Sequence, residues 1–78
     1  MSYDVHIIKS EHWFMSNERP ITEIEFTQVI KHLKDLPVFY QDGRLTLCGA
    51  NKPAIEVLIA AANKIGAKVQ GDEGEYYD

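Results

Sequence analysis

The chain has 78 residues, enough for one domain and too few for two. It is 45% hydrophobic and 26% charged, which is typical of a globular protein rather than of a disordered or membrane-embedded one. Residues 1–71 carry eight basic and eight acidic side chains, so the net charge of −4 comes from the last seven residues. A neutral body without a basic patch argues against a nucleic-acid partner.

The cysteine content and the N-terminal segment indicate in which cellular compartment the protein is expected. The single cysteine, Cys48, cannot form an internal disulfide, so stability must come from packing and a reducing cytoplasm is the natural location. The N-terminal segment lacks a basic region followed by a long apolar run, and no apolar run approaches the ~20 residues of a membrane helix. We therefore expect a cytoplasmic protein without a membrane partner.

The first predicted element is a strand over residues 3–9, with Tyr3, Val5 and Ile7 on one face. This strand is expected to be central in its sheet. Residues 10–21 follow as a predicted loop that contains the only tryptophan, Trp13. The loop is long for so short a chain, and loops of that length often carry function.

A helix is predicted to begin after Thr22. Thr22 is the expected N-cap with Glu25 as its capping-box partner, and Ile21 and Phe26 are spaced for a hydrophobic staple. The helix should end near Asp35, because Pro37 disfavours helical geometry in the residue before it. Its buried stripe is predicted to comprise Phe26, Val29, Ile30 and Leu33, with Ile24 on the opposite side.

Residues 38–40 and 44–48 are predicted to form a β-hairpin around Gln41-Asp42-Gly43, because Asp-Gly is a strong turn signal. Leu45 and Leu47 should face the core. The alternate side chains, Arg44, Thr46 and Cys48, should face away from it.

A second helix is predicted over residues 51–65, followed by a strand over 67–70. Asn51 can cap the helix, Pro53 suits its first turn, and Gly66 can end it in a left-handed conformation. Its apolar stripe recurs with helical spacing and comprises Ile55, Leu58, Ile59, Ala62 and Ile65.

The predicted order β-α-β-β-α-β favours an α+β fold, a two-layer ferredoxin-like sandwich in which two helices lie on one face of a four-stranded antiparallel sheet. The alternative is a three-stranded sheet in which residues 38–40 do not pair. The domain is expected to span residues 1–71. Residues 72–78 are expected to be an acidic C-terminal tail, by default a mobile terminus.

The sheet face without helices is predicted to be open. It would present Asp4, His6, Ile8, Thr46, Cys48, Lys68 and Gln70. Neighbouring first and third strands could bring His6 near Cys48, which is the raw material of a thiolate nucleophile. No third group is evident to orient the pair, so we favour a packing role for Cys48.

Motifs for metals, cofactors and phosphate are not evident. The histidines and Cys48 lack metal-ligand spacing, and the five glycines never cluster into a phosphate-binding loop. The open face also lacks the aromatic residues with which such sheets bind RNA. We therefore predict no metal, no cofactor and no catalytic residue.

Two segments are candidates for contact with another protein: an aromatic part of the loop and the acidic tail. They comprise His12, Trp13 and Phe14, together with Asp72, Glu73, Glu75, Tyr76 and Tyr77. Aromatic side chains are common anchors at interfaces, and an acidic segment can attract a basic partner over a distance. Trp13 could instead cap one end of the small core, and we favour that role.

Three short motifs are similar to those of a group of short uncharacterised bacterial proteins. They are a Trp-x-x-Ser loop at 13–16, a Pro-Ile-Thr helix start at 20–22, and a Val-Gln-Gly-Asp-Glu-Gly-Glu ending at 69–75. The resemblance covers most of the chain and implies no activity or catalytic residue. It does imply that the acidic end is more than a solubilising tail.

Our leading hypothesis is a non-enzymatic protein-binding domain, an inhibitor or immunity-type partner of a basic protein. The alternatives are a small-ligand or metal-responsive domain, with the open face as ligand site or homodimer interface, and a thiol-dependent enzyme through Cys48. The leading hypothesis requires a free sheet face and a free acidic end. A loop covering that face and a fixed end would remove this basis.

Overall fold

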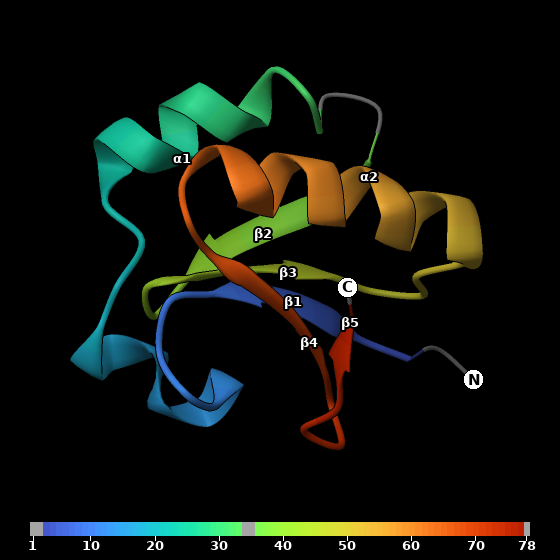
Figure 1. Ribbon diagram of the computed structural model, residues 1–78, viewed down its shortest axis with the longest axis horizontal. Helices are drawn as coiled ribbons and strands as arrows, with labels where there is room; N and C mark the ends of the chain where they lie inside the picture. Colours follow the sequence, from blue (N-terminus) through green and yellow to red (C-terminus); the bar gives the residue numbers. More distant parts are fainter. Residues whose placement is uncertain (1–2, 34–35, 78) are drawn as a thin grey trace.

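The computed structural model describes residues 3–33 and 36–77, which form an α+β fold with a five-stranded antiparallel sheet in the order β2-β3-β1-β4-β5 (Figure 1). The helical elements are the 3-10 helix η1 (Trp13–Glu18) and the α-helices α1 (Glu23–Ile30) and α2 (Lys52–Lys64). The strands are β1 (Val5–Ile8), β2 (Val38–Gln41), β3 (Arg44–Leu47), β4 (Lys68–Gly71) and β5 (Tyr76–Tyr77).

The end of the chain supplies a strand that the sequence did not predict. Tyr77 pairs with Val69 of β4, so the described residues contain five strands where four were expected. A tight turn makes this possible, since the Gly74 N–H donates to the Gly71 carbonyl at 3.0 Å and Gly74 has a φ of +90°. The expectation of a mobile tail is therefore wrong for residues 72–77, and Asp78 lies outside the described residues.

The predicted hairpin is confirmed, which excludes the three-stranded alternative. Gln41 pairs with Arg44, and the two residues between them, Asp42 and Gly43, have φ values of 51° and 78°. Positive φ at both positions is the geometry of a two-residue hairpin turn, which matches the twist of the strands. The turn packs against the preceding loop: the Ile21 N–H donates to the Gly43 carbonyl at 2.9 Å.

Helix α1 begins as predicted and ends early. Thr22 and Glu25 form the capping box, and Ile24 on the outer side is 73% exposed. The helix ends at Ile30 because the chain then tightens into i→i−3 hydrogen bonds, such as that from the Leu33 N–H to the Ile30 carbonyl at 3.0 Å. Leu33 is fully buried beyond the helix. The predicted end at Asp35 lies outside the described residues.

Helix α2 begins and ends close to the predicted residues. The Ala54 N–H donates to the Asn51 side chain at 3.0 Å, and Gly66 takes a φ of +67° after the helix. Leu58, Ala62 and Ile65 are buried as predicted, whereas Ile55 and Ile59 are half-buried at the edge of the stripe. Among the described residues, neither helix is long and apolar enough to cross a membrane.

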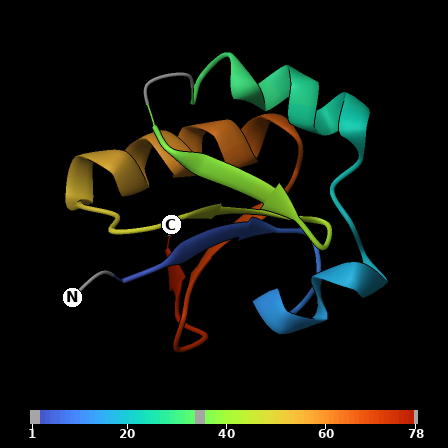
Figure 2. The same ribbon diagram turned by 180° about the vertical axis from the view of Figure 1, so that it is seen from behind.

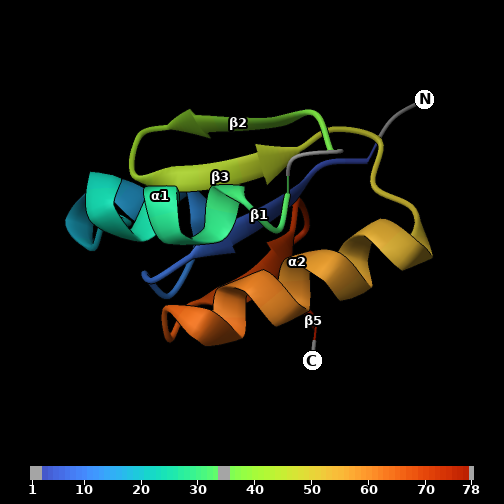
Figure 3. The ribbon, with the colours of Figure 1, turned by 90° about the horizontal axis from the view of Figure 1, so that it is seen from above.

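Both α-helices cover the same face of the sheet, as Figures 1 and 3 show, and α2 packs against β4 and β1. The core between the two layers is apolar. Its sheet side consists of Val5, Ile7, Leu45, Leu47 and Val69, and its helix side of Val29, Ala54, Leu58, Ala61 and Ala62. The predicted loop at 10–21 contains η1, which lies on the other side of the sheet, away from both α-helices (Figures 1 and 2).

Candidate functional site

The sheet face opposite the α-helices is not open. His6, Thr46 and Gln70 on this face are 3%, 4% and 1% exposed. The prediction of an open face is therefore wrong at its centre, and a homodimer through that face loses its basis. Towards the margins Asp4 is half-buried, whereas Cys48 and Lys68 are exposed. The side chains of His6, Thr46 and Gln70 each have a hydrogen-bond partner, whereas the Nε of the adjacent Arg44 is buried without one among the described residues.

His6 is the centre of this polar layer. Its Nδ1 lies 2.8 Å from the Thr46 hydroxyl oxygen, and its Nε2 lies 2.7 Å from an Asp72 carboxylate oxygen. With the proton on Nε2, the ring donates to Asp72 and accepts from Thr46. This hydroxyl–imidazole–carboxylate chain contains the elements of a nucleophile and its base. Thr46 is almost completely buried, so the arrangement acts here as a cross-link between β3, β1 and the acidic end.

Trp13 covers the polar layer on the side of η1. Its indole stacks on the His6 ring, with centroids 4.8 Å apart and planes at 20°. Its backbone N–H donates to the Gln70 side-chain oxygen at 2.7 Å, and its indole N–H donates to the Asp72 carbonyl at 3.0 Å. Trp13 therefore folds back onto the domain, but it covers the polar face of the sheet and not an end of the apolar core, where we had expected it. Trp13 and Asp72 are half-buried and are held by these internal contacts, whereas Phe14, the residue after Trp13, stays exposed.

Arg44 extends the layer towards the hairpin turn. Its guanidinium carbon lies 5.4 Å from the centre of the Trp13 ring, and its Nη1 donates to the Ser16 hydroxyl at 3.2 Å. Ser16 in turn donates to the Asp42 carbonyl at 2.6 Å. The roles of Arg44 and Ser16 were not predicted from the sequence. Strand alternation had placed Arg44 on the same face as Thr46, which was the available signal.

Above this layer lies an exposed patch that we call the aromatic–acidic surface, consisting of His12, Phe14, Glu73, Glu75 and Tyr76. Phe14 is 63% exposed and Tyr76 52%, and both glutamates are exposed. The His12 and Phe14 rings are 4.1 Å apart. His12 also touches the acidic turn, since a Cβ built on Gly74 would lie 3.1 Å from its Nε2. Two predicted partner segments, far apart in sequence, are therefore adjacent.

The two ends of this surface are anchored by tyrosine hydroxyls. The Tyr76 hydroxyl donates to the Glu11 carbonyl, and the Tyr3 hydroxyl donates to the Glu75 carboxylate. The Tyr3 hydrogen bond lowers the pKa of Glu75, and the same bond raises the pKa of Tyr3 to about 12. Burial, and then the charge of Glu75, also raise the pKa of Tyr77. Glu75 therefore remains negative at neutral pH while its position is fixed.

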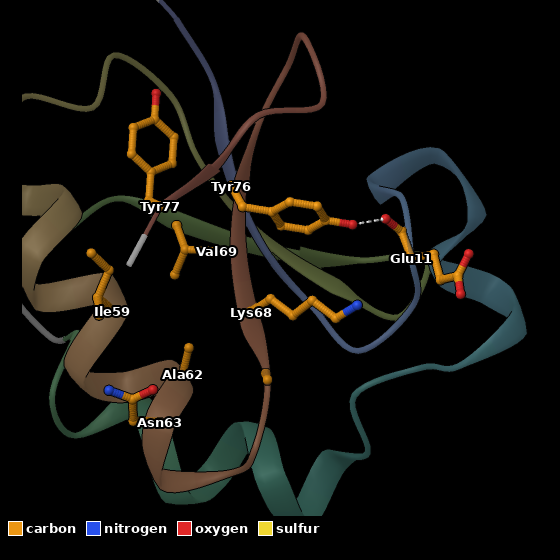
Figure 4. Close-up of a pocket in the computed structure, with 9 residues that line it drawn as sticks. Glu11, Ile59, Ala62, Asn63, Lys68, Val69, Tyr76 and Tyr77 are labelled. Atoms are coloured by element: carbon orange, nitrogen blue, oxygen red, sulfur yellow. Dashed lines mark hydrogen bonds between the residues drawn. The ribbon is translucent and has the colours of Figure 1, made fainter.

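A groove of about 830 Å³ runs between α2 and the β4–β5 pair. Figure 4 shows the side chains of Ile59 and Val69 on one side of the β4 backbone and those of Lys68 and Tyr76 on the other. The Lys68 ammonium lies 5.4 Å from the centre of the Tyr76 ring. The volume is that of a small-molecule site, with an apolar wall and one cation.

Cys48 is not brought to His6. In the β1–β3 register His6 is opposite Thr46, and Cys48 follows the end of β3. Burial of its sulfur, together with the neighbouring Asp4 carboxylate, raises the pKa of the Cys48 thiol, although the residue is exposed overall. Both ring nitrogens of His6 are engaged by Thr46 and Asp72, so the suggested Cys–His pair is not formed. Residues 3–33 and 36–77 also contain no group of three or more side chains arranged to hold a metal ion.

Comparison with known proteins adds no relative: no family model, no curated protein and no solved structure matches the chain. The resemblance to the group of bacterial proteins with a Trp-x-x-Ser loop stays a prediction. The function of this chain must therefore be inferred from its own geometry.

Proposed function

We propose that the chain is a non-enzymatic protein-binding domain that recognises a basic partner through the aromatic–acidic surface. The original basis for a recognition role, an open sheet face and a free acidic end, is removed by η1 and β5. The proposal now depends on one observation: Phe14 and Tyr76 stay exposed beside Glu73 and Glu75, while Trp13 and Asp72 hold the patch from below.

The composition of the patch suits a cationic protein surface. Its two large aromatic side chains can bury apolar area against a partner, and its two carboxylates can attract Lys and Arg side chains. The rest of the chain is neutral, so the negative potential is concentrated at this end of the sheet. Because the turn is fixed by hydrogen bonds at Gly71 and Gly74, binding does not require ordering of a flexible tail.

The test compares two double variants by affinity capture from an extract of the source cells. Phe14→Ser with Glu73→Lys alters the patch, and Glu73 is chosen because its carboxylate, unlike that of Glu75, holds no other side chain in the described structure. Ile24→Ser with Glu56→Lys is the matched control, which replaces an exposed apolar residue of α1 by serine and an exposed glutamate of α2 by lysine. Wild type and control should retain a common basic protein at low salt, and the patch variant should lose it. Equal retention by all three, or by none, would contradict the proposal.

We also propose a cytoplasmic location and an inhibitor or immunity-type role, both of which follow from the expected reducing compartment and from the lack of an assembled catalytic site among the described residues. The order β2-β3-β1-β4 with α1 and α2 on one face supports a ferredoxin-like unit to which η1 and β5 have been added. A gene for a basic toxin-like protein beside the gene for this chain would support the role, and a metabolic gene cluster would argue against it.

A small-ligand-responsive domain is a second candidate, favoured by the groove between α2 and β4–β5. Lys68 could pair with a carboxylate while the neighbouring Tyr76 ring contacts an apolar part of the same molecule. A thermal-shift screen of carboxylate metabolites should then raise the midpoint for wild type and Lys64→Gln, but not for Lys68→Gln. A flat profile for wild type would remove this candidate.

A further inference from the structure

The sheet has an unprotected edge at β2. Phe39, Tyr40 and Gln41 are exposed, and Phe39 is 54% accessible to solvent. The strand Val38–Gln41 contains no charged residue and no proline. It is an edge strand of the sheet that the described residues form (Figure 3). Edge strands usually carry charges, prolines or bulges that prevent pairing with another chain. Pro37, directly before the strand, limits any such pairing to residues 38–41.

The hairpin geometry identifies the backbone groups that point outward. A two-residue turn makes Gln41 and Arg44 a hydrogen-bonded pair, and in an antiparallel ladder such pairs alternate. Phe39 is therefore bonded to Thr46, whereas the polar groups of Val38 and Tyr40 point away from β3. The Val38 N–H agrees with this, since it donates to the Leu36 carbonyl at 2.9 Å. The Val38 carbonyl and both backbone polar groups of Tyr40 have no hydrogen-bond partner within residues 3–33 and 36–77.

The opposite edge of the sheet is protected by charge. Strand β5 has two residues and directly follows the acidic turn with Asp72, Glu73 and Glu75. Two copies that met along β5 would bring these carboxylates together and repel one another. Two copies that met along β2 would keep the acidic turns at the outer ends of a joined sheet, with β3, β1 and β4 in between.

We propose that β2 pairs antiparallel with β2 of a second copy of this chain and forms a two-fold symmetric dimer with a continuous sheet. Phe39 then lies opposite Phe39 of the second copy, at a position where side chains approach most closely. Each Tyr40 N–H donates to the Val38 carbonyl of the other copy. An uncharged strand that offers one free donor two residues from a free acceptor is complementary to itself, as a two-fold interface requires.

The experiment is sedimentation velocity on the full chain from micromolar to millimolar concentration. Wild type should shift from monomer to dimer. Phe39→Lys and Phe39→Glu place like charges opposite each other, so each alone should raise the dissociation constant by roughly tenfold or more. An equimolar mixture of the two should form a heterodimer, because opposite charges then face each other. Val57→Lys, at an exposed apolar position on α2 outside both proposed surfaces, should dimerise as wild type does.

Amide hydrogen exchange supplies a second measurement on the same samples. Protection of the Tyr40 amide should rise with protein concentration, whereas the Phe39 amide, already bonded to Thr46, should be protected at every concentration. A wild type that stays monomeric, a Phe39→Lys variant that dimerises unchanged, or growth into open-ended polymers would overturn the proposal. The circular dichroism spectrum of each variant verifies that the fold is retained.

Discussion

The two faces of the sheet are covered in different ways. The face under α1 and α2 is apolar, with Val5 and Ile7 fully buried against helical side chains. The face under η1 is polar at its centre, where His6 and Gln70 are equally buried but are held by hydrogen bonds and by the Trp13 ring. His6 and Ile7 are adjacent in one strand but are stabilised by different interactions: hydrogen bonds for His6 and apolar packing for Ile7.

The difference teaches that a small protein can cover a second sheet face without a second apolar core. An apolar layer tolerates many side chains of suitable size. In a polar layer most donors and acceptors must have hydrogen-bond partners. A buried polar group without a partner loses its hydration and lowers the free energy of unfolding. The polar face should therefore be the more specific of the two and the apolar face the larger contributor to stability.

The largest effect is expected on the apolar face. Ile7→Ala should lower the free energy of unfolding by about 2–5 kcal/mol, because it removes buried methyl groups and leaves a cavity at the central strand. Urea denaturation measures this change. Ile24→Ala, at a position 73% exposed, is the control and should change stability by less than about 0.5 kcal/mol. Similar losses in both variants would show that the α-helical layer is not the main source of stability.

The next effect is expected at His6. His6→Leu should cost about 1–3 kcal/mol, since it leaves the buried Thr46 hydroxyl without its partner. Adding Thr46→Val should restore part of the loss, because the unpaired hydroxyl is then removed as well. A double-mutant cycle by urea denaturation gives the coupling. Strictly additive losses would contradict the cross-link assigned to these two side chains.

A smaller, pH-dependent effect is expected at Tyr3 and Glu75. The pKa of Tyr3 is raised from 10.0 to about 12, so its contribution to stability is complete below about pH 10 and disappears as the pH approaches 12. The pKa of Glu75 is lowered from 4.5, so its contribution is present above that pH and disappears on acidification. Tyr3→Phe should therefore flatten both ends of the melting-temperature profile. Parallel profiles for the two proteins would contradict this pair.

The smallest effect is expected at Cys48, at the margin of the polar face. Its raised pKa leaves little thiolate at neutral pH, so alkylation of the folded protein should be slower than that of glutathione despite the exposure of the residue. Cys48→Ser should leave the unfolding midpoint unchanged. Rapid labelling at neutral pH would revive the thiol-dependent enzyme that the geometry disfavours.

Local signals in the sequence predicted much of the fold. The capping box at Thr22, the Asp42-Gly43 turn and the end of α2 at Gly66 are determined by neighbouring residues, and all three are confirmed. The early end of α1 was missed, because Leu33 continues the helical spacing and reaches the core from a tighter turn instead. Spacing alone does not distinguish these two routes to burial.

The candidate site was harder to predict because its contacts join residues far apart in the chain. Alternation placed His6, Thr46 and Gln70 on one face, but it could not show that Trp13 would cover them. The acidic composition of residues 72–78 argued for a tail, yet Gly71 and Gly74 allow a turn that returns Tyr77 to the sheet. Contacts between residues so far apart in the chain depend on tertiary packing, which a short sequence segment does not reveal.

The hairpin turn at Asp42 and Gly43 bears on how the protein can be labelled. Such tips are normally the favoured places to insert a tag or a fluorescent probe. Here the turn packs tightly against residues 16–20. A Cβ on Gly43 would lie 2.6 Å from the Cβ of Pro20, and the Ser16 hydroxyl donates to the Asp42 carbonyl. An insertion at this turn is therefore expected to displace residues 16–20 from it. The bend at Gly66 has more room, because an added Cβ meets no atom within 4 Å, but its φ of +67° requires that Gly66 itself be kept and the probe be attached beside it.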